Sequence, residues 1–181
     1  GWAGQIMNED QLKEYAEFSE GLKTRFTEKE KAAWEKKWGE LAARVRAHLH
    51  EDPAGAAGIE IGEQCMKMVS ELYGKKYRAL SKTIWEDGYK KGQVDPEHTW
   101  AEPAVVEWLD KANRAYYFSR LIEIANRASK SSHADVMAQW QELIDEMSAQ
   151  DVQGKIAQFL CSDERLNAAG CGFLESIAQA C

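Results

Sequence analysis

Proline and long apolar runs are scarce in this chain, and it lacks a basic face. Only three prolines occur among 181 residues, at positions 53, 96 and 103, and the apolar–polar alternation that is typical of strands is rare. These two absences favour an all-helical protein.

The apolar runs are too short to span a bilayer, so a membrane is not an expected partner. The net charge of −7 is spread without the basic face that nucleic-acid phosphates require, which argues against nucleic acid as a partner of this chain.

The cysteines form no redox or disulfide motif that the sequence makes evident. Cys65, Cys161, Cys171 and Cys181 show neither CxxC nor tight framework spacing. We interpret them as reduced thiols of a cytoplasmic protein. The first four residues lack an initiating methionine and a basic segment. We interpret them as a remnant or cut point rather than a signal peptide.

A catalytic or metal-binding constellation is also lacking. His48 and His50 are two residues apart and point to different sides of a helix, whereas a helical metal pair needs a spacing of about three or four. Cys65 lies on the apolar stripe of its helix, where a thiol is usually a small, inert hydrophobe. Its reaction with a ligand is left open. We predict no catalytic residue, no metal and no cofactor, and a protein that is not an enzyme.

Capping signals and apolar stripes predict seven or eight helices. Thr27 to Glu30 fit the capping-box pattern, and Pro103 suits a first helical turn. Asp52-Pro53 breaks the chain, because proline lacks a backbone donor and restricts the residue before it. The longest predicted loop covers residues 92–102. The helical stripes cover about residues 8–21, 28–49, 61–74, 77–88, 103–125, 136–147, 150–160 and 163–179.

What the chain does have is large amphipathic rings in helical segments rich in Lys and Glu. Trp34, Trp38 and Trp140 fall on the main apolar stripes, and we interpret them as core residues. The other rings lie beside the stripes or in the long loop, where core packing is a weaker explanation. Rings with one polar edge are suited to holding a flat, apolar, partly polar ligand. The predicted ligand-binding residues are Trp85, Tyr89, Trp100 and Trp108, with His98 and Tyr116 as polar contacts.

The order of three motifs resembles the TipAS antibiotic-recognition domain. Trp38-x-x-Leu41 with Val45 is followed by Asp52-Pro53 and then by a helix containing Ile61-Gly62-Glu63-Gln64-Cys65. The family has a Trp-x-x-Leu helix and a short Asp-Pro-type turn in this order. An aromatic stretch like Leu80 to Tyr89 and a closing helix like Pro103 to Tyr117 come next. The resemblance covers residues 10–117. The chain departs from the family where an Ala-x-Arg-Trp or similar start is replaced by Gly62-Glu63-Gln64-Cys65.

The resemblance implies an all-α, somewhat globin-like fold that encloses a bulky peptide or polyaromatic antibiotic. Family members are either effector-sensing halves of MerR-like transcription activators or stand-alone proteins that sequester the drug, as albicidin-binding proteins do with tandem domains. We expect the stand-alone, drug-sequestering form, which confers antibiotic resistance, because no DNA-binding segment precedes residue 10 and the charge is acidic. An effector-sensing domain and a helical protein-interaction module remain alternatives, and a homodimer stays open.

Residues 118–181 have no counterpart in a single domain of this kind. We expect them to form a C-terminal helical extension, either a degenerate second copy or a lid. Trp38-Gly-Glu-Leu41 and Trp140-Gln-Glu-Leu143 share a frame that fits a second copy. Chance similarity between two amphipathic helices explains the same frame, since the flanking residues agree poorly.

Overall fold

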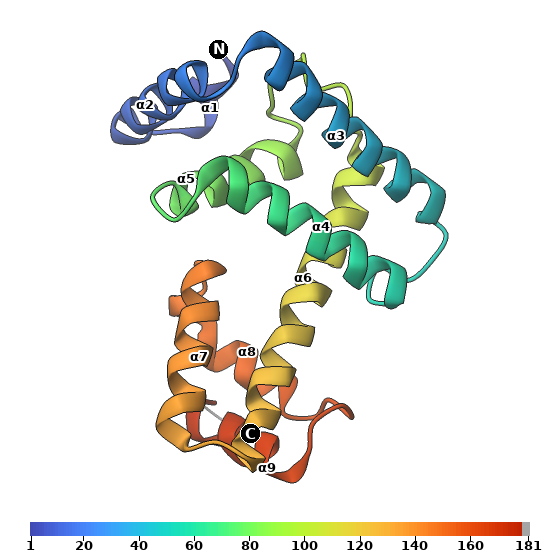
Figure 1. Ribbon diagram of the computed structural model, residues 1–181, viewed down its shortest axis with the longest axis vertical. Helices are drawn as coiled ribbons and strands as arrows, with labels where there is room; N and C mark the ends of the chain where they lie inside the picture. Colours follow the sequence, from blue (N-terminus) through green and yellow to red (C-terminus); the bar gives the residue numbers. More distant parts are fainter. Residues whose placement is uncertain (179–181) are drawn as a thin grey trace. The chain divides into compact units, whose positions relative to one another are not determined.

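The computed structural model describes residues 1–178 and is helical throughout its ordered elements (Figure 1). In this range it has nine α-helices, four short 3-10 or π-helical turns and no strand. The α-helices are α1 (Trp2–Ile6), α2 (Glu9–Arg25), α3 (Glu28–His48), α4 (Ala56–Tyr73), α5 (Arg78–Thr83), α6 (Pro103–Asn126), α7 (His133–Glu146), α8 (Gln153–Leu160) and α9 (Ala168–Ile177). The short turns are η1 (Ile84–Gly88), η2 (Tyr89–Lys91), η3 (Arg127–Ser129) and η4 (Gln150–Val152). The predicted all-α class is confirmed.

Local capping chemistry sets the starts of α2 and α3. Asn8 accepts from the Gln11 amide at 2.9 Å, and the Gln11 side chain accepts from the Asn8 amide at 2.9 Å. Thr27 and Glu30 form the same reciprocal pair at the start of α3. Each pair satisfies two backbone donors that the helix itself leaves without partners. These starts agree with the prediction because they depend on neighbouring residues only.

Two segments differ from the expected pattern. The first residues, for which no helix was predicted, are helical: Trp2 lies in α1, and its ring meets Tyr15 edge-on with centroids 5.4 Å apart. Both rings pack against a core cluster that includes Met7 and Phe18. The helix expected over 77–88 changes character at Ile84, where the α-helical bonding of α5 gives way to the π-helical turn η1.

The chain divides into two compact units, Gly1–Ala115 and Tyr116–Cys181. The division falls inside α6, whereas the sequence placed it between residues 117 and 118. In the first unit, α3 and α4 bury Leu41, Val45, Ile61 and Cys65 against Leu109 of α6.

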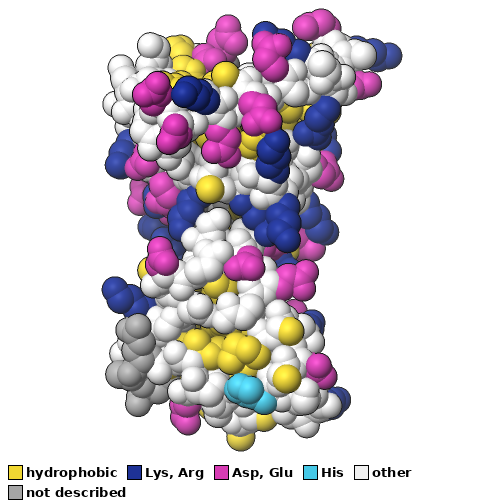
Figure 2. Space-filling model, turned by 90° about the vertical axis from the view of Figure 1, so that its left-hand side faces the viewer, with side chains coloured by type: hydrophobic (Ala, Val, Ile, Leu, Met, Phe, Trp, Pro, Cys, Tyr) yellow, Lys and Arg dark blue, Asp and Glu magenta, His cyan; other side chains and the backbone are white. Residues whose placement is uncertain are grey.

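Figure 2 shows Lys, Arg, Asp and Glu side chains interspersed over the visible face, so no large surface of one sign forms there.

The second unit has a core of its own around Trp140. This indole is fully buried and meets Phe173 edge-on at 5.8 Å, which confirms the interpretation of Trp140 as a core residue. Asn126 and Asn167 tie the end of α6 to the start of α9: the Asn167 amide donates to Asn126 Oδ1 at 2.9 Å. Trp38 is only half-buried, so the two tryptophans of the shared frame have different environments.

The cysteines match the expectation only in part. Cys65 and Cys171 are free thiols, but Cys161 is disulfide-bonded, so the expectation of reduced thiols is wrong at that position. Cys181 and the predicted helix end at 179 lie outside the described residues. In the described part of the chain, we find no helix with the length and apolar character needed to cross a membrane.

Candidate ligand-binding site

A row of half-buried aromatic rings runs through the first unit, and we call it the aromatic ladder. Its members, in order of contact, are Phe26, Trp34, Trp38, Trp100, Tyr89 and Trp85. Successive ring centroids lie 5.1 to 6.3 Å apart, within the range of favourable aromatic pairing. The rings come from segments that are distant in sequence, so the ladder exists only in the folded unit.

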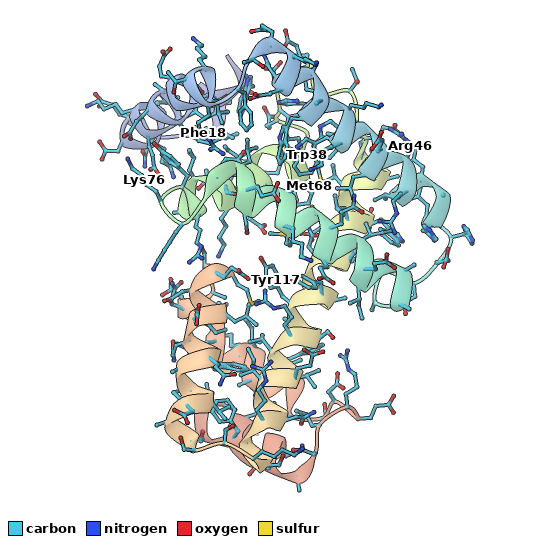
Figure 3. All side chains as sticks on the ribbon, in the orientation of Figure 1. Phe18, Trp38, Arg46, Met68, Lys76 and Tyr117 are labelled. Carbon is cyan, nitrogen blue, oxygen red and sulfur yellow. The ribbon has the colours of Figure 1, made fainter. Side chains whose placement is uncertain are left out.

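Trp38 anchors the ladder to the core. It projects from α3 near Met68 of α4 (Figure 3) and packs against the buried cluster that contains Met68. Trp34 lies one turn earlier on the same helix and meets Trp38 edge-on at 6.3 Å. A helical spacing of four residues places both indoles on one face. Trp34 and Trp38 are therefore at the edge of the core, half-buried, rather than inside it as the stripe predicted.

Trp100 joins the α3 half of the ladder to the η1–η2 half. Its indole stacks on Trp38 at 5.2 Å with the planes 17° apart, and it contacts Tyr89 at 5.1 Å with the planes 30° apart. Trp100 belongs to the irregular segment 92–102, which folds into tight turns such as the bond from the His98 amide to the Asp95 carbonyl. The loop therefore delivers one ring to a position flanked by rings from helical segments.

A π-helical turn positions the other two rings. Trp85 lies in η1 and Tyr89 follows directly in η2, with centroids 5.7 Å apart. Bonding to the fifth residue widens this turn relative to an α-helix, and such turns are frequent at functional sites. Gly88 lies where the chain leaves the turn, and a Cβ there would come within 3.2 Å of the Gln93 carbonyl oxygen.

Charged groups fix the Trp85 end of the ladder. The Trp85 indole N–H donates to Asp110 Oδ1 at 2.9 Å. Lys90 Nζ lies 3.4 Å from Asp110 Oδ2 and 3.0 Å from Glu86 Oε2. Burial acts to lower the pKa of Lys90, but its bonds to these two carboxylates outweigh that effect and raise the pKa. The bond to Asp110 therefore holds the Trp85 ring in one orientation.

The structure brings four of the six predicted residues together. Trp85, Tyr89 and Trp100 are in the ladder, and His98 is exposed with its ring 6.0 Å from that of Tyr89. The other two are placed elsewhere. Trp108 is 6% exposed and packs in the core, where its N–H donates to the Glu51 carbonyl at 3.0 Å. Core burial of this kind leaves it no surface with which to line a groove.

Tyr116 belongs to the second unit. Its ring contacts Tyr117 at 5.3 Å and lies under the Arg120 guanidinium at 5.5 Å. The sequence analysis assigned it to the ligand site as a polar contact at one end of the predicted aromatic site. The stripe continues past the division between the units, which no local pattern marked.

Sequence reasoning missed Phe26, Trp34, Trp38 and Asp110 as site residues. The spacing of Trp34 and Trp38 was visible, but a position on an apolar stripe does not distinguish the centre of a core from its edge. Within the described residues, Trp34 Nε1 is buried without a hydrogen-bond acceptor. An unsatisfied buried donor is costly, and this signal comes only from coordinates.

The rings of the ladder contact one another directly. A shallow, open, polar depression lies beside η1 and contains none of the ladder rings. It is lined by Gln5, Ile6, Asp87, Lys91 and Gln93. We place the candidate site at the ladder, because the depression offers no aromatic ring surface and little apolar surface.

Removing the carboxylate of Asp110 is expected to release Trp85. Asp110→Ala deletes the acceptor of the indole N–H and leaves Lys90 with Glu86 alone. We expect a red shift of tryptophan emission and a loss of about 1 kcal/mol of unfolding free energy, the usual net value of such a bond. Glu107→Ala on the same helix is the control, because its pair with Lys111 is exposed and worth little. An unchanged emission maximum in Asp110→Ala would contradict the role of this bond.

The chain matches no protein-family model, and no match is found among curated proteins or solved structures. The resemblance to the TipAS domain therefore rests on the motifs themselves.

Proposed function

We propose that the first unit binds and sequesters a bulky aromatic or peptidic antibiotic, albicidin-like or thiopeptide-like, and so confers drug tolerance without chemical change. The observation that carries this proposal is the aromatic ladder. Its six rings are all half-buried, and a loop indole lies in contact with Trp38 on one element and Tyr89 on another. Rings that serve only the core are usually covered more completely.

The ladder supplies enough interaction energy for a useful binder. Apolar surface contributes about 25 cal/mol per Å² on burial, and each aromatic pair adds about 0.5–1.5 kcal/mol. Two or three rings in contact with a ligand therefore support micromolar to nanomolar affinity, roughly −8 to −12 kcal/mol. The exposed His98 adds a polar group beside Tyr89, near one end of the row.

Two alternative functions differ in the surface that they would use. An effector-sensing domain of a MerR-like activator would bind its ligand through the same ladder, so the two readings predict the same binding measurements. A helical protein-interaction module is favoured instead by Phe159 of the second unit, which is 69% exposed and contacts Phe118 at 5.6 Å. That surface predicts capture of a protein and no response to small aromatic molecules.

Titration of intrinsic tryptophan fluorescence tests the proposal. An albicidin-like compound, a thiopeptide and a non-aromatic peptide are added to the wild-type chain. We expect strong quenching by one of the aromatic compounds and none by the peptide, with the ligand recovered unchanged by mass spectrometry. Trp38→Ala is expected to weaken binding by about tenfold, since loss of one stacking pair is worth about 1.4 kcal/mol.

Trp2→Ala is the matched control for this measurement. Trp2 is also a half-buried indole of the first unit, but it contacts Tyr15 and lies outside the ladder. Its removal is expected to leave the affinity unchanged. The proposal fails if no aromatic compound alters the emission, or if Trp2→Ala and Trp38→Ala weaken binding equally.

A further inference from the structure

Trp100 differs from every other ring of the ladder in the segment that carries it. Trp34 and Trp38 lie in α3, Phe26 ends α2, and Trp85 and Tyr89 lie in η1 and η2. Trp100 alone comes from the irregular segment 92–102. Removing that one indole would separate the two halves of the ladder and leave Trp38 and Tyr89 facing the vacated space.

The indole of Trp100 is held as a planar guest would be held. Trp38 stacks on it at 17°, Tyr89 contacts it at 30°, and both centroids are about one stacking distance away, at 5.2 and 5.1 Å. Such offset stacking and tilted contact are the geometries that aromatic rings prefer. The surroundings are therefore already complementary to a flat bicyclic ring with one polar edge.

Apart from the packing of Trp100 itself, the loop has few polar attachments beyond its own turns. Residues 96–99 are all exposed, and the backbone bonds of this stretch close local turns, such as those from the His98 amide to Asp95 and from the Ala101 amide to His98. At the end of the loop, Glu102 pairs with Arg46 of α3 at 2.8 Å (Arg46 is labelled in Figure 3), and both side chains are at least 40% exposed. An exposed ion pair contributes at most about 1 kcal/mol.

We propose that Trp100 is an internal occupant of the ligand site: its indole holds the place of a planar, uncharged, indole-sized aromatic group of the ligand and leaves when that group binds. This inference rests on the proposed function and names the chemical class of the group recognised between Trp38 and Tyr89. The loop would then also regulate affinity. The ligand binds only to molecules in which Trp100 has left the site, so the apparent affinity falls with the fraction of such molecules.

Chemical complementation with free indole tests the inference directly. Trp100→Gly deletes the ring and opens the space, and indole is titrated by calorimetry against the variant and the wild type. We expect indole to bind the variant at least about tenfold more tightly than the wild type, since the wild-type site is self-occupied. Thr99→Gly is the matched control, because it loosens the same exposed loop and keeps the indole. Equal binding of indole by wild type, Thr99→Gly and Trp100→Gly overturns the inference.

A measurement on the wild-type chain covers the case in which Trp100→Gly does not fold. The chain is labelled with fluorotryptophan, and the Trp100 resonance is assigned with Trp100→Phe, which keeps a ring in the same place. Saturation with the compound found in the fluorescence screen is expected to move the Trp100 resonance to a solvent-exposed position. A Trp100 resonance that keeps its buried position in the saturated complex overturns the inference.

The outcomes separate this inference from the proposed function. Binding of indole by Trp100→Gly, with no antibiotic bound by any variant, supports the internal occupant and contradicts the sequestering function. Antibiotic binding by the wild type, without a gain of affinity in Trp100→Gly, supports the function and contradicts the internal occupant.

Discussion

Replacing Gly58 with alanine is expected to lower the unfolding free energy of the first unit by about 3 kcal/mol or more. A Cβ at this position would lie 1.8 Å from the carbonyl oxygen of Pro53 and 2.4 Å from its carbonyl carbon. Both are backbone atoms, so no side chain can rotate away. The turn at Pro53 or the first turn of α4 has to move by about an ångström or more to relieve the overlap.

The consequence extends beyond the turn because α4 carries core residues. Ile61, Cys65 and Met68 follow Gly58 on this helix and pack with Leu41 and Val45 of α3. A displacement of α4 therefore opens the core on which Trp38 rests. We expect ligand binding to weaken together with stability.

Gly39→Ala is the control for Gly58→Ala. Gly39 lies within α3, and a Cβ there would meet nothing within 4 Å. Alanine is favoured over glycine inside a helix, so this variant should gain about 0.5–1 kcal/mol. Denaturant unfolding of the two variants and the wild type measures both effects. A Gly58→Ala chain as stable as the wild type would mean that the close approach of α4 to Pro53 is incorrect.

The second large effect is a loss of stability at alkaline pH. Burial raises the pKa of the Tyr73 phenol, with further contributions from Tyr89 and Tyr15. Burial likewise raises the pKa of Tyr89, with contributions from Tyr15 and Asp95. Burial raises the pKa of the Cys65 thiol to about 12, although a hydrogen bond with Asn113 acts in the opposite direction.

All three groups bind their protons more tightly in the folded chain than in the unfolded chain. Their contribution is complete below the unfolded pKa values, about 8.5 for Cys and about 10 for Tyr. Above those values the unfolded chain loses protons that the folded chain keeps, so the free energy of unfolding falls as pH rises toward the folded pKa values. Together the three groups predict a loss of about 3 kcal/mol between roughly pH 10 and pH 11.

Denaturant unfolding across the alkaline range, with phenolate absorbance recorded in parallel, measures this loss. Tyr73→Phe removes one ionisable phenol and keeps the ring, so its loss over the same interval should be smaller by about 1 kcal/mol. Stability that stays constant through the interval would contradict the prediction. So would phenolate formation at Tyr73 in the folded chain.

The helices were predictable because their signals are local. The capping pairs at Asn8 and Thr27 and the break at Asp52-Pro53 each depend on residues within one turn, and all three are present in the structure. The helix α1 was missed because five residues are too few for a period to show. The π-helical turn at Ile84 was missed because its residues fit an ordinary apolar stripe.

The candidate site was predictable only where a ring lay off the main stripes. Trp85, Tyr89 and Trp100 were selected for that reason, and they meet in the folded unit. Trp108 also lies beside a stripe, yet it is buried, since α6 is covered on more than one side. Trp38 lies on a stripe and is only half-buried. The stripe did not show this, because one of the rings that contact Trp38 is Trp100, which comes from a distant loop segment.

By itself, the sequence determined that this chain is helical, where most helices begin, and that large amphipathic rings are concentrated in its first two thirds. These properties follow from hydrogen bonding and side-chain spacing within one or two helical turns. Only the tertiary structure decided which rings are buried, which meet, and that the indole of Trp100 fills the place between Trp38 and Tyr89. The burial and contacts of each ring depend on residues far apart in sequence. In a close-packed interior, the side chains of the whole unit together determine which rings are buried.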